Sequence, residues 1–219
     1  MTFISPARLH KQRIAAEQAA KQSATEPSSE YQLGLATLDQ QRRALSGVQS
    51  RETQQGMKKE YLATWQGYID TTLAENTGKK DDPIISRIWV WLMDTGDFDQ
   101  AIAVGKYMLD NDINPPESFN RSTATTFAEE MAEAWLKPHG KRTITADHLI
   151  ETLDIVKDCD VFDEVMAKLY RATAESLGTQ QQGGDDETTL GLYNRALELN
   201  PKVGCKKARD EIEKRLTKQ

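Results

Sequence analysis

Apolar positions recur at helical spacing along most of the chain. Between Tyr61 and Leu73, apolar residues recur every three or four positions, which places them on one face of an α-helix. Val and Ile are sparse, and no segment shows the sustained alternation of apolar and polar residues that half-buried strands require. The pattern predicts an all-α protein.

The segment after Asp82-Pro83 is apolar almost all round, which is typical of a helix buried in a core or an interface. Asp is a good helix cap, and Pro is favoured at the first helical position. Gly96 is suited to end this helix and Asp97 to cap the next one. We expect the core and the oligomer interface to include Trp65, Ile88, Trp89, Trp91 and Leu92.

The N-terminal part has a heptad-like stripe. Tyr31, Leu38 and Leu45 are spaced seven residues apart in one predicted long helix that continues through Val48. Such a stripe is expected of a helix that packs on another helix, for example one from a neighbouring subunit.

Two segments, 96–102 and 192–201, resemble the turn and second helix of a tetratricopeptide unit. No copies occur between them at the 34-residue period of that repeat, so we predict local helical hairpins and no solenoid. The predicted fold is a multi-helix bundle of hairpins with long N-terminal helices and a tetratricopeptide-like C-terminal helix pair. We divide it into a mildly basic N-terminal region for DNA contact or oligomerisation (1–60), a central helical core (61–177), and a linker with the C-terminal helix pair for partner docking (178–219).

Composition and charge narrow the range of possible functions. The 219 residues carry a formal net charge of -6, but residues 1–60 and the tail from Lys202 are basic around an acidic middle. This distribution favours DNA binding by the ends of the chain over binding by the whole surface. Cys159 and Cys205 form no CxxC pair, and no apolar run reaches the ~20 residues of a membrane span. We expect a protein of a reducing cytoplasm without membrane contact.

The sequence offers little catalytic chemistry. It has no phosphate-binding loop, no HExxH or GxSxG motif, and no paired Cys/His metal spacing. Asp94-Thr95-Gly96 matches the aspartic-protease tripeptide, but it lies between two predicted helices and is better interpreted as a helix end. Adjacent acids such as Asp81 and Asp82 do not converge on a metal. We predict a protein that is not an enzyme and has no cofactor and no metal.

Two basic regions remain as candidate binding sites. For one chain, each could be only a solvated, salt-bridged face, but a ring of many copies would turn weak phosphate contacts into tight binding. The candidate DNA-binding residues are Arg8, Lys11, Arg13, Arg42, Arg43, Arg51, Lys58 and Lys59. The candidate partner-docking residues are Lys206, Lys207, Arg209 and Arg215.

Residues 88–102, IWVWLMDTGDFDQAI, resemble the central signature of the phage terminase small subunit family, in its gene-M type from temperate contractile-tailed phages. The opening Ser5-Pro6-Ala7-Arg8, the block 127–130 and the stretch 195–207 are similar to further family segments in the same order. The resemblance spans nearly the whole chain.

The resemblance implies a division of labour in DNA packaging. A family member forms a ring-like homo-oligomer in the host cell cytoplasm, recognises the packaging site on double-stranded viral DNA, and regulates the large terminase subunit. The ATPase and the endonuclease are then expected on the large subunit. Two alternatives stay open: a monomeric tetratricopeptide-like adaptor for a protein partner, and a metal-dependent endonuclease that uses clustered acids such as Asp81 and Asp82.

Overall fold

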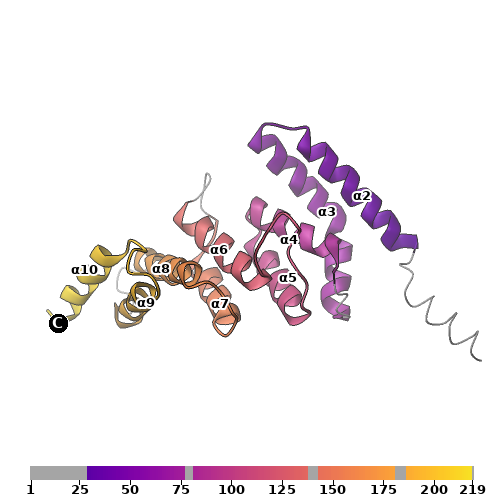
Figure 1. The fold of residues 1–219 in the computed structure, drawn as a ribbon. Coiled ribbons are helices and arrows are strands. Elements are labelled where there is room, and N and C mark those ends of the chain that lie inside the picture. The colour runs from indigo at the N-terminus through magenta and orange to yellow at the C-terminus, as the bar shows by residue number, and fades with distance from the viewer. Residues whose placement is uncertain (1–28, 77–80, 138–142, 181–185, 219) are drawn as a thin grey trace, which may run out of the picture. The chain divides into compact units, whose positions relative to one another are not determined.

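The computed structural model describes residues 29–76, 81–137, 143–180 and 186–218, and their regular secondary structure is entirely helical (Figure 1). The predicted all-α fold class is confirmed. The helices are α2 (Ser29–Ser46), α3 (Arg51–Glu75), α4 (Pro83–Thr95), α5 (Phe98–Asp110), α6 (Thr123–Leu136), α7 (Ala146–Val156), α8 (Asp163–Gln180), α9 (Asp186–Leu199) and α10 (Lys206–Leu216). None of these helices combines the length and apolarity of a membrane span.

The chain divides into two compact units, Met1–Gly47 and Val48–Gln219. In the first unit, Leu38 and Leu45 of the heptad-like stripe are buried on α2. The prediction that this helix continues through Val48 is wrong, because α2 ends at Ser46 and the Ser50 side chain caps α3 by accepting a hydrogen bond from the Thr53 amide.

The second unit contains α3 to α10. Helix α3 crosses the boundary that the sequence analysis placed between residues 60 and 61. The basic residues at its start therefore share a helix with the buried Leu62, Trp65 and Ile69. Helix α3 packs on α4 and α5, and α8 packs on α6, α7 and α9.

The α4–α5 hairpin follows the predicted capping pattern. The Asp82 carboxylate caps α4 by accepting from the Ile84 amide at 2.9 Å, and Pro83 occupies the first turn. Gly96 ends α4 at φ 78°, a left-handed conformation that glycine adopts without steric cost. Asp97 caps α5 by accepting from the backbone amide of Gln100.

The centre of the core lies where α4, α5 and α6 meet. The buried Trp89 indole donates to the carbonyl of Ala101 at 3.0 Å, and its ring lies edge-on to Phe127 with centroids 5.7 Å apart. Gly105 makes this approach possible, because a Cβ there would lie 2.9 Å from Trp89 Nε1 and 3.1 Å from the Phe127 ring. The residues proposed for the core are all buried: Trp65, Ile88, Trp89, Trp91 and Leu92.

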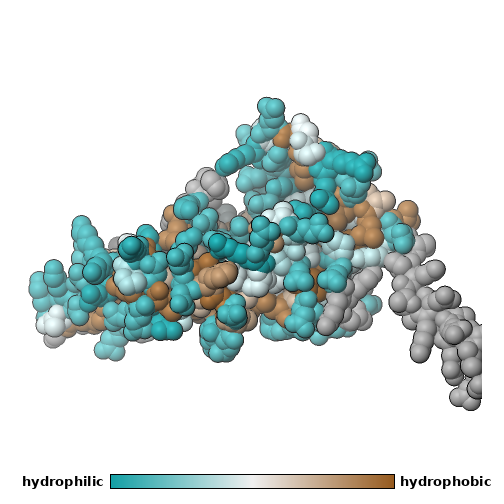
Figure 2. Space-filling model, in the orientation of Figure 1, coloured by the Kyte–Doolittle hydropathy of each residue, from teal (hydrophilic) through white to brown (hydrophobic). Residues whose placement is uncertain are grey.

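A smaller apolar cluster joins α8 to the C-terminal helix pair and includes Tyr193, Ala196 and Ile212. Arg171 of α8 donates to the carbonyl of Val203 at 2.7 Å, which ties the turn between α9 and α10 to α8. On the face shown in Figure 2, hydrophilic residues predominate, and hydrophobic residues show between them.

Candidate DNA and subunit interfaces

The candidate DNA-binding residues divide into three groups. Arg8, Lys11 and Arg13 lie outside the described residues. Arg42 and Arg43 are exposed on α2, where Arg43 pairs with Asp39 at 2.6 Å. Both partners of that pair are more than half exposed, so the pair contributes little to stability and can exchange for a phosphate contact.

On α3, the structure separates the basic residues by environment. Arg51 and Lys59 are exposed and have no acidic partner among the described residues. The Lys58 side chain is only 16% exposed, and its Nζ lies 2.7 Å from Asp94 Oδ2 at the end of α4. Lys58 therefore links two helices. Local sequence patterns could not predict this pair, because its members are 36 residues apart.

An acidic cluster on α6 lies close to Asp94. Glu129 contacts Arg121 and Lys168, and the carboxylate of Glu133 also contacts Lys168. Glu130 has neither an ion pair nor a hydrogen bond within the described part of the chain. Its burial, together with the charges of its acidic neighbours, raises its pKa to about 7. In the described ranges, no three His, Cys, Asp or Glu residues are placed to hold a metal ion.

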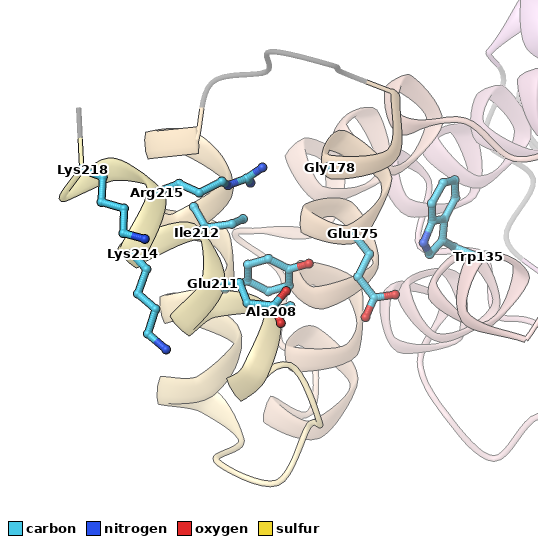
Figure 3. A pocket seen from close by; sticks show the side chains of 10 residues that line it. Trp135, Glu175, Gly178, Ala208, Glu211, Ile212, Lys214, Arg215 and Lys218 are labelled. Carbon is cyan, nitrogen blue, oxygen red and sulfur yellow. The ribbon is translucent and has the colours of Figure 1, made fainter.

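A groove of about 660 Å³ opens between α10 and helices α6, α8 and α9 (Figure 3). Apolar side chains and charged side chains both line it. Its residues are Trp135, Glu175, Gly178, Tyr193, Ala208, Glu211, Ile212, Lys214, Arg215 and Lys218. Burial, with a smaller contribution from the charge of Glu175, raises the pKa of Tyr193 to about 12, so its phenol stays neutral at physiological pH.

The charges of the groove are neutralised unevenly. Glu175 pairs with Arg171 at 2.7 Å, and Arg215 pairs with Asp186 at 2.8 Å. Lys214 on α10 and Lys218 just after its end are exposed without an acidic partner among the described residues. One side of the groove therefore presents uncompensated positive charge.

Of the candidate partner-docking residues, only Arg215 lines the groove. Lys206 and Lys207 are exposed in the first turn of α10, and the Lys207 side chain is 93% exposed. Arg209 contacts Asp210 and Glu213, each at 3.0 Å, so its guanidinium forms ion pairs within its own helix. Among the described residues Lys206 has no ion pair, and Lys207 has only an exposed pair with Glu211 at 4.0 Å, so these are the most available cations of this set.

Comparison with known proteins identifies the class of this helical protein. The sequence model of the phage small terminase subunit family matches residues 35–164, more than half of the chain. That match covers α3 to α7, the α4–α5 hairpin with its Asp-Thr-Gly-Asp turn, and the acidic cluster of α6. The chain belongs to the phage small terminase subunit family.

One relative extends the similarity beyond that region. The chain is 30% identical over 215 residues to the protein of Escherichia phage P2 named "Terminase, endonuclease subunit", covering 97% of this chain and 85% of the relative. No solved structure matches the chain.

Proposed function

We propose that the protein acts as a terminase small subunit in the host cell cytoplasm, where it binds double-stranded viral DNA at the packaging site and regulates the large terminase subunit. The observation that carries this proposal is the family membership, together with similarity to one phage terminase protein along almost the full chain. The protein assembles into a ring-like homo-oligomer, so that one weak basic face is repeated around a common axis.

In this proposal, the exposed N-terminal cations contact the DNA. Arg42, Arg43, Arg51 and Lys59 support this assignment, since each is exposed and either unpaired in the described part of the chain or held only by a surface ion pair. Such side chains bind phosphates and displace counterions, which makes binding salt-dependent. Arg8, Lys11 and Arg13 extend the same basic region. Lys58 is left out because Asp94 holds it.

The first turn of α10 is the proposed docking surface for the large subunit. Lys206 and Lys207 project from it, and both are exposed. The ATPase and endonuclease activities belong to the large subunit in this proposal, although the relative from phage P2 has "endonuclease subunit" in its name. Purified protein should therefore leave DNA uncut with Mg²⁺ when the large subunit is absent, and Lys206→Ala/Lys207→Ala should lower its effect on the large subunit's ATPase.

Fluorescence anisotropy tests the DNA-binding part of the proposal. The probe is a labelled duplex that carries the joined ends of the viral chromosome, compared with a scrambled duplex of equal length at several salt concentrations. The variant Arg42→Ala/Arg43→Ala/Arg51→Ala/Lys59→Ala should bind more weakly, and its salt slope should fall by roughly one for each phosphate contact removed.

The matched control removes the same number of charges elsewhere on the protein. Its substitutions are Lys106→Ala, Lys157→Ala, Arg195→Ala and Lys202→Ala, at exposed positions outside the proposed interfaces. Equal losses in both variants would mean that only net charge matters. Unchanged binding in the first variant would move DNA contact to another part of the chain.

A further inference from the structure

The turn between α7 and α8 presents an aromatic side chain to solvent. Phe162 is 64% exposed, although the guanidinium of Arg121 lies 5.6 Å from its ring centroid. A single exposed apolar side chain is ordinary on a protein surface, but aromatic side chains are common anchors of protein interfaces.

Acidic residues surround this aromatic side chain along the sequence. Asp158, Asp160, Asp163 and Glu164 lie within four residues of Phe162, and none of the four has an ion pair within the described ranges. We refer to residues 158–164 as the acidic Phe162 turn. It combines one apolar anchor with uncompensated negative charge.

The C-terminal groove has the complementary character. Tyr193, Ala208 and Ile212 supply apolar surface, while Lys214 and Lys218 supply positive charge that no acid of the described chain neutralises. The volume of about 660 Å³ is within the range of pockets that bury a drug-sized ligand. The groove can therefore receive an aromatic side chain with acidic neighbours.

One chain cannot make this contact with itself. Phe162 directly precedes α8, whereas Glu175 and Gly178 line the groove near the other end of the same helix. Gly178 lies 15 positions after Asp163, which corresponds to about 22 Å at the helical rise of 1.5 Å per residue. The rigid helix keeps the anchor and the groove apart within each copy, so only two copies could bring the two surfaces together.

We propose that the acidic Phe162 turn of one copy docks into the C-terminal groove of the next. Two different surfaces at opposite ends of one helix form a head-to-tail contact, which generates closed rings or open chains of subunits. Phe162 is the apolar anchor, and the lysines steer the acidic turn and fix its register. This inference rests on the self-assembly in the proposed function but not on the DNA binding.

Disulfide trapping tests the contact, because Cys159 already lies exposed in the acidic Phe162 turn. Lys218→Cys places a second thiol at the groove. Mild oxidation at pH 8.5 should then link neighbouring copies into a ladder of dimers, trimers and larger species on a non-reducing gel. Adding Phe162→Ala should reduce this ladder at least about tenfold, as expected for loss of an interface anchor.

Three controls accompany the trapping. Lys202→Cys carries the same change on an exposed lysine outside the groove and should give no ladder. Cys159→Ala in the Lys218→Cys protein should abolish the ladder, which excludes linkage through the buried Cys205. Circular dichroism melts of all variants show whether a loss of linkage reflects unfolding.

Charge reversal gives an independent measurement by light scattering. Asp160→Lys alone and Lys218→Glu alone should each shift the assembly toward smaller species, and the two together in one chain should restore it. An absent ladder with a retained multi-subunit mass would overturn this contact but leave self-assembly standing. A monomeric mass for the wild-type protein would overturn the contact and the proposed assembly together, and a ladder unaffected by Phe162→Ala would overturn the anchor.

Discussion

Lys58 of α3 lies 2.7 Å from Asp94 at the end of α4, and this pair connects the first half of the long helix α3 to the Asp-Thr-Gly-Asp turn. Gln55 strengthens the connection by donating to the carbonyl of Asp94 at 3.3 Å. The next residue, Lys59, is exposed and has no acidic partner among the described residues. Two adjacent lysines thus have different roles, the first in stability and the second available to a ligand.

Substitution of these neighbours separates the two roles. Lys58→Ala should lower the free energy of unfolding by about 1 kcal/mol, since it removes a charge-assisted hydrogen bond from a mostly buried side chain. Lys59→Ala should leave stability within ~0.5 kcal/mol of the wild type and reduce the salt slope of DNA binding by about one. Urea melts and DNA titrations of both variants measure this difference. The reverse result would assign the phosphate contact to Lys58.

Local sequence signals predicted much of the fold. The caps at Asp82 and Asp97 and the helix end at Gly96 were identified correctly because each depends on a residue and its immediate neighbours. The break after Ser46 was missed, since continuing apolar spacing obscured a short Gly47–Ser50 connection. Helix boundaries depend on which competing cap forms, and this choice is weakly encoded in spacing alone.

The candidate interfaces were less accessible to sequence reasoning. Composition identified basic regions but could not distinguish Lys58 from Lys59, because the partner of Lys58 lies 36 residues away. The groove beside α10 combines side chains from α6, α8, α9 and α10, so no local sequence motif could predict it. Tertiary contacts decide which cations stay available to bind a ligand. Those contacts cannot be identified from the spacing of residues in a single sequence.

The contact at Gly105 predicts a strong effect from one added methyl group. Gly105→Ala should destabilise the protein by about 1–3 kcal/mol, because its Cβ would press on the indole of Trp89 and the ring of Phe127. Gly67→Ala in α3 is the matched control, since its Cβ meets no atom within 4 Å. That change should stabilise the helix by about 0.5–1 kcal/mol. Thermal melts that rank the two variants the other way would contradict the packing argument.

The raised pKa of Glu130 predicts that the stability of the protein depends on pH. Its pKa is raised from 4.5 to about 7, so between these pH values the folded protein holds a proton that the unfolded chain releases. Its contribution to stability is full below pH 4.5, falls as pH rises to about 7, and is constant above that. Glu130→Gln cannot ionise, so it should gain ~1 kcal/mol over the wild type between pH 5 and pH 8, a figure reduced for partial solvent contact.

Urea melts of Glu130→Gln and the wild type across that pH range measure the difference. Glu129→Gln is the control, because Glu129 pairs with Arg121 at 2.6 Å and with Lys168 at 3.4 Å. Its loss should destabilise the protein at neutral pH. A stability difference between Glu130→Gln and the wild type that does not change with pH would show that Glu130 titrates near its ordinary value.

His148 closes the N-terminus of α7 and joins it to α5. Its Nδ1 accepts from the Thr145 amide at 3.1 Å while its own amide donates to Thr145 Oγ1, and its Nε2 lies 3.0 Å from the Asp99 carboxylate. His148→Ala should cost about 1 kcal/mol of stability, a typical value for a lost cap. His148→Gln should recover about half of that loss, because Gln at this position can accept from the same amide.

Asp99→Ala tests the link between His148 and α5 by itself. Since the Asp99 side chain is 91% exposed, we expect this variant to lose less than ~0.5 kcal/mol of stability. If Asp99→Ala cost as much as His148→Ala in urea melts, the contribution of His148 would come from the link between the helices and not from the cap.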